Sequence, residues 1–315
     1  MKNDAKILIT GSSGYIGSAL FKNLEEKGIK VVGYDIIEGE DIMDKKKLTR
    51  KMKEVNPDIV IHLAALSSVT ACNEDINKAI MYNGVGTRNV LDAMKKCGCN
   101  KIIYAGTSSV YGNCDKIYLP YTEESKIGAS SAYGLTKLIG ELVIFNHFNN
   151  KENPGSYLIY RMFNVVGSSG YDEIDRTSNP GYDRLFSALE SGKIIIYGND
   201  YQTYDGTCLR DYVALKDICT AFIKGIEILK YRKDLKEIIN ICSGSPCSVD
   251  LIVNIWNVYS KKHKLPHIQK TYGKRREGDP AIVYGSNHKA KRILDWEPVR
   301  KIKDIIIDLA NDKNL

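Results

Sequence analysis

The sequence predicts an α/β protein built around a doubly wound parallel sheet, with a smaller α/β lobe attached to it. Two observations favour this fold. Short apolar runs alternate with longer stretches of helical period along the first half of the chain, and a glycine triplet joins the first run to the first helix. The length of 315 residues exceeds the usual size of a single domain, so we expect a sheet-based core and a second lobe.

The expected strands are short apolar runs, at Lys6–Thr10, Lys30–Asp35, Asp58–Ala65, Lys101–Thr107 and Ser156–Asn164. The expected helices lie between them, at Gly17–Lys27, Ile76–Lys96 and Ser131–Asn149. Because strands and helices alternate, we expect the strands to run parallel in one sheet that helices cover on both faces.

The segment TGSSGYIGSAL places Gly11, Gly14 and Gly17 between the first strand and the first helix. Glycines there allow a tight turn and let backbone N–H groups approach a pyrophosphate at the positive end of the helix. A glycine triplet is weak evidence by itself, but this place between an apolar strand and an amphipathic helix is typical of a Rossmann dinucleotide site. We expect Tyr15 and Ile16, which lie between the glycines, to contact the cofactor too.

Asp35 ends the second expected strand, about 20 residues past the glycines, where a carboxylate can accept hydrogen bonds from both hydroxyls of an adenosine ribose. A 2′-phosphate would meet like charge there, so NAD is favoured over NADP. The alternative is an acidic residue that merely caps the next turn. At the end of the third strand, Leu63, Ala64 and Ala65 would let the backbone approach the cofactor, whereas His62 is expected to be a packed or solvated strand residue.

These features divide the chain into an NAD-binding Rossmann domain, residues 1–164, and a smaller substrate-binding lobe, residues 165–315. The division is placed after Asn164 because the stretch that follows is rich in Gly, Ser and Asp and has no periodicity of its own. The apolar run Glu237–Cys242 is able to return to the main sheet. We therefore expect interleaved lobes, with a return of the chain around residues 211–242.

The composition limits the expected partners and compartments. Hydrophobic residues make up 43% and charged residues 26%, and no apolar run approaches the roughly 20 residues that would span a membrane. The chain enters its first strand without a secretory signal, so we expect a cytoplasmic protein. The net charge of +7 suits an anionic ligand, but Lys and Arg are spread evenly, which favours a solvated basic surface and does not imply nucleic acid. The eight cysteines lack zinc-ligand spacing, so no metal is expected.

Tyr133 and Lys137, in YGLTK, are four residues apart and so share one face of a helix. A tyrosine with a pKa of about 10 is a poor base at neutral pH, and a neighbouring ammonium group favours its phenolate. The alternative is a surface Tyr and Lys on an amphipathic helix. Thr107 ends the fourth expected strand, where strand C-termini face the ligand crevice, so its hydroxyl could hold the reacting oxygen of a substrate.

Together these residues resemble the extended short-chain dehydrogenase/reductase superfamily, whose members use a Ser or Thr, a Tyr and a Lys. The resemblance implies that Thr107, Tyr133 and Lys137 are catalytic and contact the cofactor or the substrate. Within the superfamily, YGNDYQTYDGTCLRDYV (Tyr197–Val213) and RREGDP (Arg275–Pro280) are similar to substrate-lobe motifs of the UDP-glucose 4-epimerase family. A UDP-sugar is therefore the expected partner.

The same resemblance implies further site residues. Arg210, Arg276 and Asp279 would hold the UDP phosphates and ribose, and arginine is suited to bidentate phosphate contacts. In FNVVG, Phe163 would lie near the nicotinamide and Asn164 on the substrate. The other implied contacts are Asp41, Ile42 and Asn83 for the cofactor and Ile196, Tyr197 and Val283 for the substrate.

The chain departs from the family pattern in several places. The stretch between Asp35 and Asp41 is much shorter than is typical, so we expect a differently built adenine pocket. GYDRLF (Gly181–Phe186) lacks the expected asparagine before its helix. Ser108 and Ser109 stand where related dehydratases carry Asp and Glu. Because neutral hydroxyls cannot easily replace two carboxylates in eliminating water, epimerisation is favoured over dehydration.

The expected activity is therefore an NAD-dependent 4-epimerisation that interconverts UDP-glucose and UDP-galactose through a 4-keto sugar. Val283 stands where narrow-specificity members carry a bulky tyrosine, so UDP-GlcNAc and UDP-GalNAc are expected substrates too, unless Val283 packs and another residue closes the pocket. The alternatives are a related epimerase or reductase for another nucleotide or a uronic acid, and a non-catalytic NAD-sensing protein. The family commonly forms homodimers through helices that correspond to Ile76–Lys96 and Ser131–Asn149.

Overall fold

The computed structural model describes residues 5–113, 119–167, 185, 192–263, 265–276 and 279–311. The chain forms two compact units that alternate along the sequence. Unit 1 consists of Met1–Gly112, Ile127–Arg161 and Cys219–Ile239, and unit 2 consists of Asn113–Lys126, Met162–Ile218 and Asn240–Leu315. The division at residue 164 that the sequence suggests stays a prediction.

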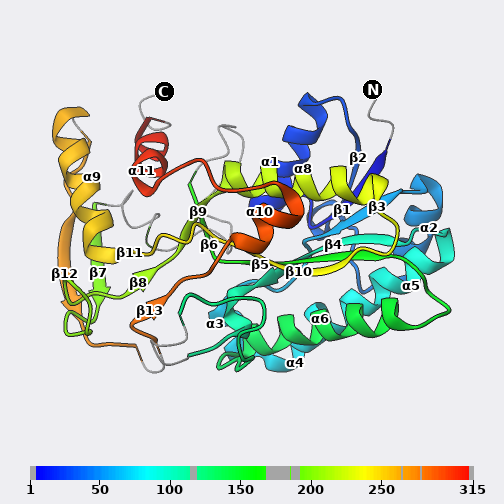
Figure 1. Cartoon of the computed structure of the whole chain (residues 1–315), viewed down its shortest axis with the longest axis horizontal. Coiled ribbons are helices and arrows are strands. Elements are labelled where there is room, and N and C mark those ends of the chain that lie inside the picture. Colours follow the sequence, from blue (N-terminus) through cyan, green and yellow to red (C-terminus); the bar gives the residue numbers. More distant parts are fainter. Residues whose placement is uncertain are drawn as a thin grey trace. The chain divides into compact units, whose positions relative to one another are not determined.

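A six-stranded sheet forms the centre of unit 1 (Figure 1). Its strands are β1 (Lys6–Thr10), β2 (Lys30–Tyr34), β3 (Ile59–His62), β4 (Lys101–Thr107), β5 (Ser156–Met162) and β10 (Lys236–Ile241). They lie in the order β2-β1-β3-β4-β5-β10, and β1 pairs in parallel with β2 and β3, as β3 does with β4. Ile7, Leu8 and Ile9 of β1 have no exposed surface, as expected for a central strand covered on both faces. The predicted doubly wound α/β fold is confirmed.

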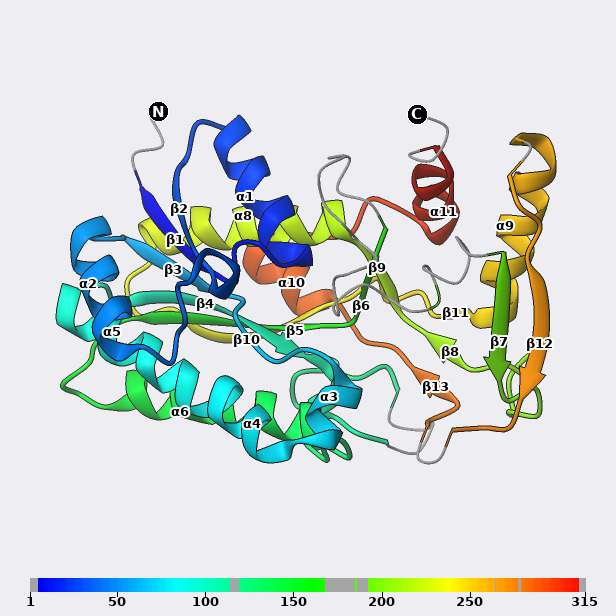
Figure 2. The same ribbon diagram turned by 180° about the vertical axis from the view of Figure 1, so that it is seen from behind.

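Helices cover both faces of this sheet (Figures 1 and 2). The helices on one face are α1 (Tyr15–Glu26) and α8 (Leu215–Tyr231), and those on the other are α2 (Lys45–Val55), α5 (Thr87–Cys97) and α6 (Ala132–Asn149). α2 was not predicted because most of its residues are charged. The helix forms because Leu48, Met52 and Val55 recur at helical spacing and are buried against the core.

The segment Ile76–Lys96 was predicted to be one helix, and the structure divides it. A short helix α3 (Val69–Glu74) precedes it, and α4 (Ile76–Ile80) passes into the π-helical turn Met81–Gly86 before α5 begins. Gly84 and Gly86 within the turn disfavour a regular helix, although the apolar residues on both sides have helical spacing. The turn widens the helix where the Asn83 side chain reaches buried partners.

Three predicted strands end earlier than expected, whereas β1 and β4 have the predicted bounds. β2 ends at Tyr34 because Asp35 caps the 3-10 turn Ile36–Glu38. β3 ends at His62, before the predicted Leu63–Ala65. β5 ends at Met162, and residues beyond it form the separate strand β6 (Asn164–Val166), which pairs in parallel with β9 (Tyr212–Ala214).

Unit 2 contains several small sheets and helices. Its other strands are β7 (Lys193–Tyr197), β8 (Leu209–Arg210), β11 (Cys247–Ser248), β12 (Gln269–Gly273) and β13 (Ile282–Val283). β8 pairs antiparallel with β11 and parallel with β13, and β7 pairs in parallel with β12. The helices are α9 (Val249–His263), α10 (His288–Leu294) and α11 (Ile302–Asn311). α9 lies beside β7 and β12 in both views (Figures 1 and 2). Trp256 of α9 is buried.

Across the described ranges, no helix has both the length and the apolar character that a membrane span requires. The same residues contain no group of three or more His, Cys, Asp or Glu side chains that could hold a metal ion.

Candidate active site

The glycine turn after β1 is a narrow cradle. Gly11 has a φ of +75°, and a Cβ there would lie 2.6 Å from the Ala64 nitrogen. A Cβ at Gly17, in the first turn of α1, would collide with the Gly11 carbonyl oxygen. Glycine is therefore required at both positions, and the turn leads from the end of β1 into the positive N-terminus of α1. Because a pyrophosphate needs this close backbone approach, the residues present fit NAD.

The neighbours of these glycines are unequally exposed. Tyr15 is buried in the unit, whereas Ile16 is half-buried. Gly14 is the N-cap residue of α1 and caps it without a side chain. Their contact with a cofactor stays a prediction.

Asp35 lies beside this cradle and is 6% exposed. Its Oδ1 accepts a hydrogen bond from the Ile37 N–H at 3.0 Å, so Asp35 caps the 3-10 turn, and its contact with a ribose stays a prediction. Its Oδ2 accepts another from the Ser13 N–H at 2.9 Å, within the glycine turn. The carboxylate therefore joins the turn after β2 to the turn after β1, and its lone pairs can accept further hydrogen bonds.

Asp41 and Ile42 lie in the short connection between β2 and α2. The Asp41 carboxylate accepts hydrogen bonds from the Met43 N–H at 2.8 Å and from the Tyr82 hydroxyl at 3.4 Å. Ile42 is 3% exposed, and its carbonyl oxygen accepts a hydrogen bond from the Asn89 amide at 3.1 Å. Both residues are thus anchored within unit 1, and their contact with adenine stays a prediction.

His62, at the end of β3, is buried between two threonines. Its Nδ1 lies 2.7 Å from Thr10 Oγ1, and its Nε2 lies 3.0 Å from Thr87 Oγ1. The Thr87 hydroxyl donates to the Asn83 carbonyl oxygen, so we assign the ring proton to Nε2 and the accepted hydrogen bond to Nδ1. Burial and then the charge of Lys137 lower the pKa of His62 to about 3. The neutral ring joins β1, β3 and α5.

The Asn83 side chain links the loop after β3 to helix α6. Its amide donates to the Leu66 carbonyl at 3.1 Å and to Thr136 Oγ1 at 2.9 Å, and its Oδ1 accepts from the Leu66 N–H at 2.8 Å. The Thr136 hydroxyl donates in turn to the Tyr133 carbonyl oxygen at 3.0 Å. Asn83 was predicted as a cofactor contact. Its amide links the loop after β3 to helix α6, and its contact with a cofactor stays a prediction.

β4 and α6 bring Thr107 and Tyr133 together. Ser131 caps α6 by accepting a hydrogen bond from the Gly134 N–H at 3.1 Å. A Cβ at Gly134 would lie 2.6 Å from the Ser109 carbonyl oxygen, so the first turn of α6 packs directly on the residues that follow β4. The Thr107 side chain lies close enough to Tyr133 there to lower its pKa. The structure thus juxtaposes two of the three predicted catalytic residues.

Lys137 lies one turn further along α6 and is 2% exposed. Its Nζ lies 4.2 Å from the centroid of the Tyr104 ring, a cation–π distance. Burial lowers the pKa of Lys137 to about 7, although Glu141 opposes that shift. Burial also raises the pKa of Tyr133 to about 12, although its hydrogen bond with Thr107 opposes that one. Desolvation thus raises the pKa of Tyr133, where the Tyr133–Lys137 spacing predicted that the pKa would be lowered.

Glu141 and Arg161 are buried charged residues that the sequence analysis missed. Arg161 Nη2 lies 2.7 Å from Glu141 Oε2, and Arg161 Nε lies 3.1 Å from Oε1, so the ion pair is bidentate. Glu141 follows Lys137 by four residues on α6, which places both on one side of the helix. The i, i+4 spacing of Lys137 and Glu141 could have suggested this neighbour, but its partner on β5 could not be read locally.

Arg210 and Asp279 meet in unit 2. Arg210 Nη2 lies 2.5 Å from Asp279 Oδ1, and the Arg210 guanidinium also donates to the Leu209 carbonyl oxygen at 2.7 Å. β8 and β13 pair Arg210 with Val283, so the two residues share one face of this small sheet. Val283 is half-buried. Three predicted substrate contacts therefore lie together where β8 pairs with β13: Arg210, Asp279 and Val283.

The strand β7 presents Tyr197 and buries Ile196. Tyr197 is 38% exposed, and the Arg276 guanidinium lies 4.2 Å from its ring centroid, so the two predicted contacts pack together. Ile196 is 2% exposed. Because its side chain faces the interior of unit 2, a ligand could reach it only through its backbone.

Phe163 and Asn164 lie where β5 gives way to β6. Phe163 is 4% exposed, and a Cβ at Gly285 would lie 2.5 Å from its ring. The Asn164 N–H donates to the Asp211 carbonyl oxygen at 3.1 Å, while its side chain is half-buried. The Gly181–Phe186 segment, apart from Leu185, and residues Glu277 and Gly278 lie outside the described residues.

Comparisons with known proteins find relatives that match nearly the whole chain. The model of the NAD dependent epimerase/dehydratase family matches residues 7–242. UDP-glucose 4-epimerase 2 of Arabidopsis thaliana is 31% identical, over 97% of this chain and 94% of the relative. The crystal structure of UDP-glucose 4-epimerase from Brucella ovis in complex with NAD superposes with a TM-score of 0.88 at 27% identity, over 98% of each chain. The Bifidobacterium longum enzyme in complex with NAD+ and UDP gives a TM-score of 0.82 at 26% identity, also over 98% of each chain.

Proposed function

This chain belongs to the NAD-dependent epimerase/dehydratase family, among its UDP-glucose 4-epimerases, and we propose that it interconverts UDP-glucose and UDP-galactose with inversion at C4. The observation that carries the proposal is the meeting of Thr107 and Tyr133 at the end of β4, one helical turn from Lys137. The same unit holds the glycine cradle, whose close backbone approach fits NAD.

The cofactor is held in this proposal by the residues of the cradle and its surroundings. Gly11, Gly14 and Gly17 admit the pyrophosphate, and Asp35 accepts hydrogen bonds from the adenosine ribose. When bound, NAD supplies a hydride acceptor and a positive charge at the nicotinamide. The remaining cofactor contacts are proposed at Tyr15, Ile16, Asp41, Ile42, Leu63, Ala64, Ala65, Asn83, Tyr133, Lys137 and Phe163.

Tyr133 is the proposed base. As the phenolate, its oxygen takes the proton from the sugar O4 while the hydrogen on C4 leaves as hydride, which makes C4 a ketone and Tyr133 a neutral phenol. Thr107 donates a hydrogen bond to the reacting oxygen, and Lys137 in its charged form stabilises the phenolate. Returning the hydride to the other face of C4, and the proton from Tyr133 to O4, inverts the centre without net oxidation.

The substrate is anchored in this proposal through its nucleotide and not through the reacting sugar. Arg210 and Arg276 contact the diphosphate, and Asp279 accepts hydrogen bonds from the ribose. Affinity from groups that do not react leaves the hexose free to turn between the two hydride transfers. Asn164, Ile196, Tyr197 and Val283 complete the proposed substrate contacts.

The residues after Thr107 favour epimerisation over the rival reactions. Ser108 and Ser109 follow it, and the Ser109 side chain is within 3.2 Å of Thr107 Oγ1. Neutral hydroxyls there provide no carboxylic acid or carboxylate for eliminating water. A reductase would consume the reduced cofactor stoichiometrically, whereas the proposed reaction returns it in every cycle.

We further propose that UDP-GlcNAc and UDP-GalNAc are substrates. Val283 is half-buried beside Arg210, so the site proposed for the nucleotide is next to a small side chain. A valine leaves more room for an N-acetyl group than a tyrosine would. The alternative, that Val283 only packs, predicts little turnover of the acetylated sugars.

A homodimer in the cytoplasm is the proposed form of the protein. The helices α4 and α6 pack side by side, and the exposed apolar residues along them and the adjoining turn are Ile76, Met81, Leu135, Leu142 and Phe145. These residues are 40–57% exposed. A second copy of the chain would bury this apolar face.

The central test is the assay of UDP-glucose and UDP-galactose interconversion by the intact protein. Tyr133→Phe removes the proton acceptor and should lower kcat at least about a hundredfold while NAD stays bound. The Tyr231→Phe variant, which removes an exposed phenol of α8 in unit 1, is the matched control. Unchanged turnover in Tyr133→Phe would remove Tyr133 from the mechanism.

A further inference from the structure

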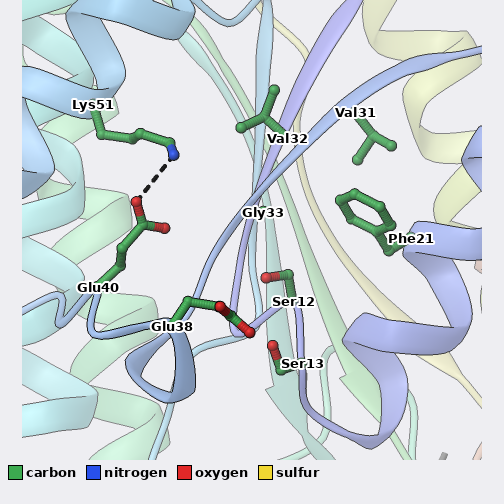
Figure 3. Close-up of a pocket in the computed structure, with 9 residues that line it drawn as sticks. All are labelled: Ser12, Ser13, Phe21, Val31, Val32, Gly33, Glu38, Glu40 and Lys51. Atoms are coloured by element: carbon green, nitrogen blue, oxygen red, sulfur yellow. Dashed lines mark hydrogen bonds and ion pairs between the residues drawn. The ribbon is translucent and has the colours of Figure 1, made fainter. Parts of the chain in front are cut away.

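A pocket of about 620 Å³ opens beside the glycine turn in unit 1 (Figure 3). Ser12 and Ser13 of the glycine turn lie at one end of it, Gly33 of the edge strand β2 forms part of its wall, and Glu38 closes it from the turn after β2. Phe21, Val31 and Val32 are the apolar residues that line the pocket beside β2. The pocket therefore combines two hydroxyls and carboxylates with an apolar wall.

The pocket adjoins the place where the adenosine ribose is proposed to bind. Ser13 lines the pocket, and its N–H donates to Asp35 Oδ2 at 2.9 Å. A carboxylate at the end of β2 in a Rossmann fold holds the ribose hydroxyls, and a 2′-phosphate, where one is present, needs a cationic partner next to it. A Cβ at Gly33 would lie 2.5 Å from Ser12 Oγ, so the Ser12 hydroxyl lies directly against β2. Ser13 thus belongs both to the pocket and to the hydrogen bond with Asp35, so the pocket adjoins the place proposed for the ribose.

The charges of the pocket oppose a phosphate, although it holds a lysine. Lys51 Nζ lies 3.0 Å from Glu40 Oε1, and Figure 3 shows this ion pair on the side opposite Phe21. Their side chains are 28% and 15% exposed, respectively. Glu40 thus neutralises Lys51, the one lysine among the described residues that line this pocket, and Glu38 adds a second carboxylate.

We propose that this pocket is a latent site for the 2′-phosphate of NADP, and that Glu38 and Glu40 close it to that phosphate and make the protein selective for NAD. Glu38 acts by repulsion, whereas Glu40 acts by engaging Lys51, which would otherwise pair with the phosphate beside the Ser12 and Ser13 hydroxyls. The inference rests on the proposed position of the cofactor at Asp35. In this proposal, the selection of NAD over NADP depends not only on Asp35 but also on residues of the short connection between β2 and α2.

The test compares the cofactors that the variants bind. Glu38→Gln, Glu40→Gln and the double variant are purified from the same host, and the NADP to NAD ratio released on denaturation is measured by mass spectrometry. Dissociation constants for both cofactors are then measured on protein depleted of its cofactor. The double variant should bind NADP at least about tenfold more tightly relative to NAD than the unmodified protein does.

Two further variants control for net charge and for the role of the lysine. Glu54→Gln, an exposed residue of α2 that does not line the pocket, removes the same charge and should leave the ratio unchanged. Lys51→Gln added to Glu40→Gln should abolish the gain in NADP binding. Because Glu38 is exposed, Glu38→Gln by itself tests the repulsion in a protein that keeps the Glu40–Lys51 ion pair.

Either of two results would overturn the proposal: an unmodified protein that releases NADP and NAD equally, or a double variant whose preference stays within about twofold of the unmodified protein. UDP-hexose epimerisation is assayed in parallel. Absent epimerisation in the unmodified protein would contradict the proposed function, while the cofactor ratios would still decide whether this pocket selects the cofactor.

Discussion

Glu141 and Arg161 form a bidentate ion pair with Arg161 Nη2 2.7 Å from Glu141 Oε2, one helical turn beyond Lys137. Both side chains are nearly inaccessible, at 3% and 4% exposure. Arg161 also lies over the Tyr111 ring, with 5.0 Å between its guanidinium carbon and the ring centroid. Glu141 thus brings a negative charge close to a lysine that burial would otherwise deprotonate.

Replacing Glu141 with Gln should move the alkaline limb of activity to lower pH. Burial lowers the pKa of Lys137 to about 7 and Glu141 raises it, so losing Glu141 lowers that pKa further. Since the charged lysine is the form proposed to stabilise the phenolate, activity should be lost at a lower pH. The pH profile of kcat measures the shift, with the exposed Glu152→Gln as the control. An alkaline limb identical to that of the unmodified protein would exclude this role of Glu141.

Replacing Arg161 with Met should lower the free energy of unfolding by about 3–5 kcal/mol, because it leaves the Glu141 carboxylate buried without its partner. Urea unfolding at neutral pH measures the loss. Arg88→Met, which breaks an exposed pair with Asp92, should cost less than about 1 kcal/mol. Equal decreases in the free energy of unfolding in the two variants would mean that burial does not determine how much these ion pairs stabilise the protein.

Buried His62 should make the protein less stable in mild acid. Its folded pKa, about 3, is below the ordinary value of 6.5, so the unfolded chain binds the extra proton between these values. Stability from this residue is therefore present above about pH 6.5 and declines as pH falls through that window. His62→Gln should flatten the decline in the free energy of unfolding measured from pH 7 to 5. The exposed His288→Gln should leave it unchanged, and a slope unaffected by His62→Gln would show that His62 does not cause the decline.

Replacing Arg210 with Lys should weaken substrate binding more than the chemical step. Lysine keeps the positive charge but loses the fork that contacts Asp279 and, by proposal, the diphosphate. KM for UDP-galactose and the inhibition constant of UDP should each rise about tenfold, with a smaller change in kcat. Arg275→Lys, at the exposed pair with Asp200, is the comparison variant. A fall in kcat at unchanged KM would place Arg210 in the chemistry instead.

Replacing Val283 with Tyr should narrow the substrate range. The larger ring beside Arg210 would fill the space proposed for an N-acetyl group, so kcat/KM for UDP-GlcNAc should fall at least about tenfold more than that for UDP-glucose. NMR of the sugar anomeric protons follows both reactions. A parallel fall for the two sugars, or no turnover of UDP-GlcNAc by the unmodified protein, would contradict the role of Val283.

Local patterns were sufficient for much of unit 1. The bounds of β1 and β4 follow from runs of apolar residues at the centre of a sheet, and α1 and α6 were predicted to within two residues at each end. The same reasoning failed at Met81–Gly86, where the helix widens around Asn83 although the apolar residues on both sides have helical spacing. Strand and helix periods are short-range properties, whereas a π-helical turn depends on what its side chains meet across the fold.

By itself, the sequence determined the alternation that builds the parallel sheet, the glycine turn and the Tyr133–Lys137 spacing, because each depends only on residues that are close together in the sequence. Tertiary structure decided which groups are buried beside which. It joined Asp35 to Ser13, paired Glu141 with Arg161 and set Val283 next to Arg210. It also reversed the expected shift in the pKa of Tyr133, because desolvation depends on the density of atoms from several distant segments.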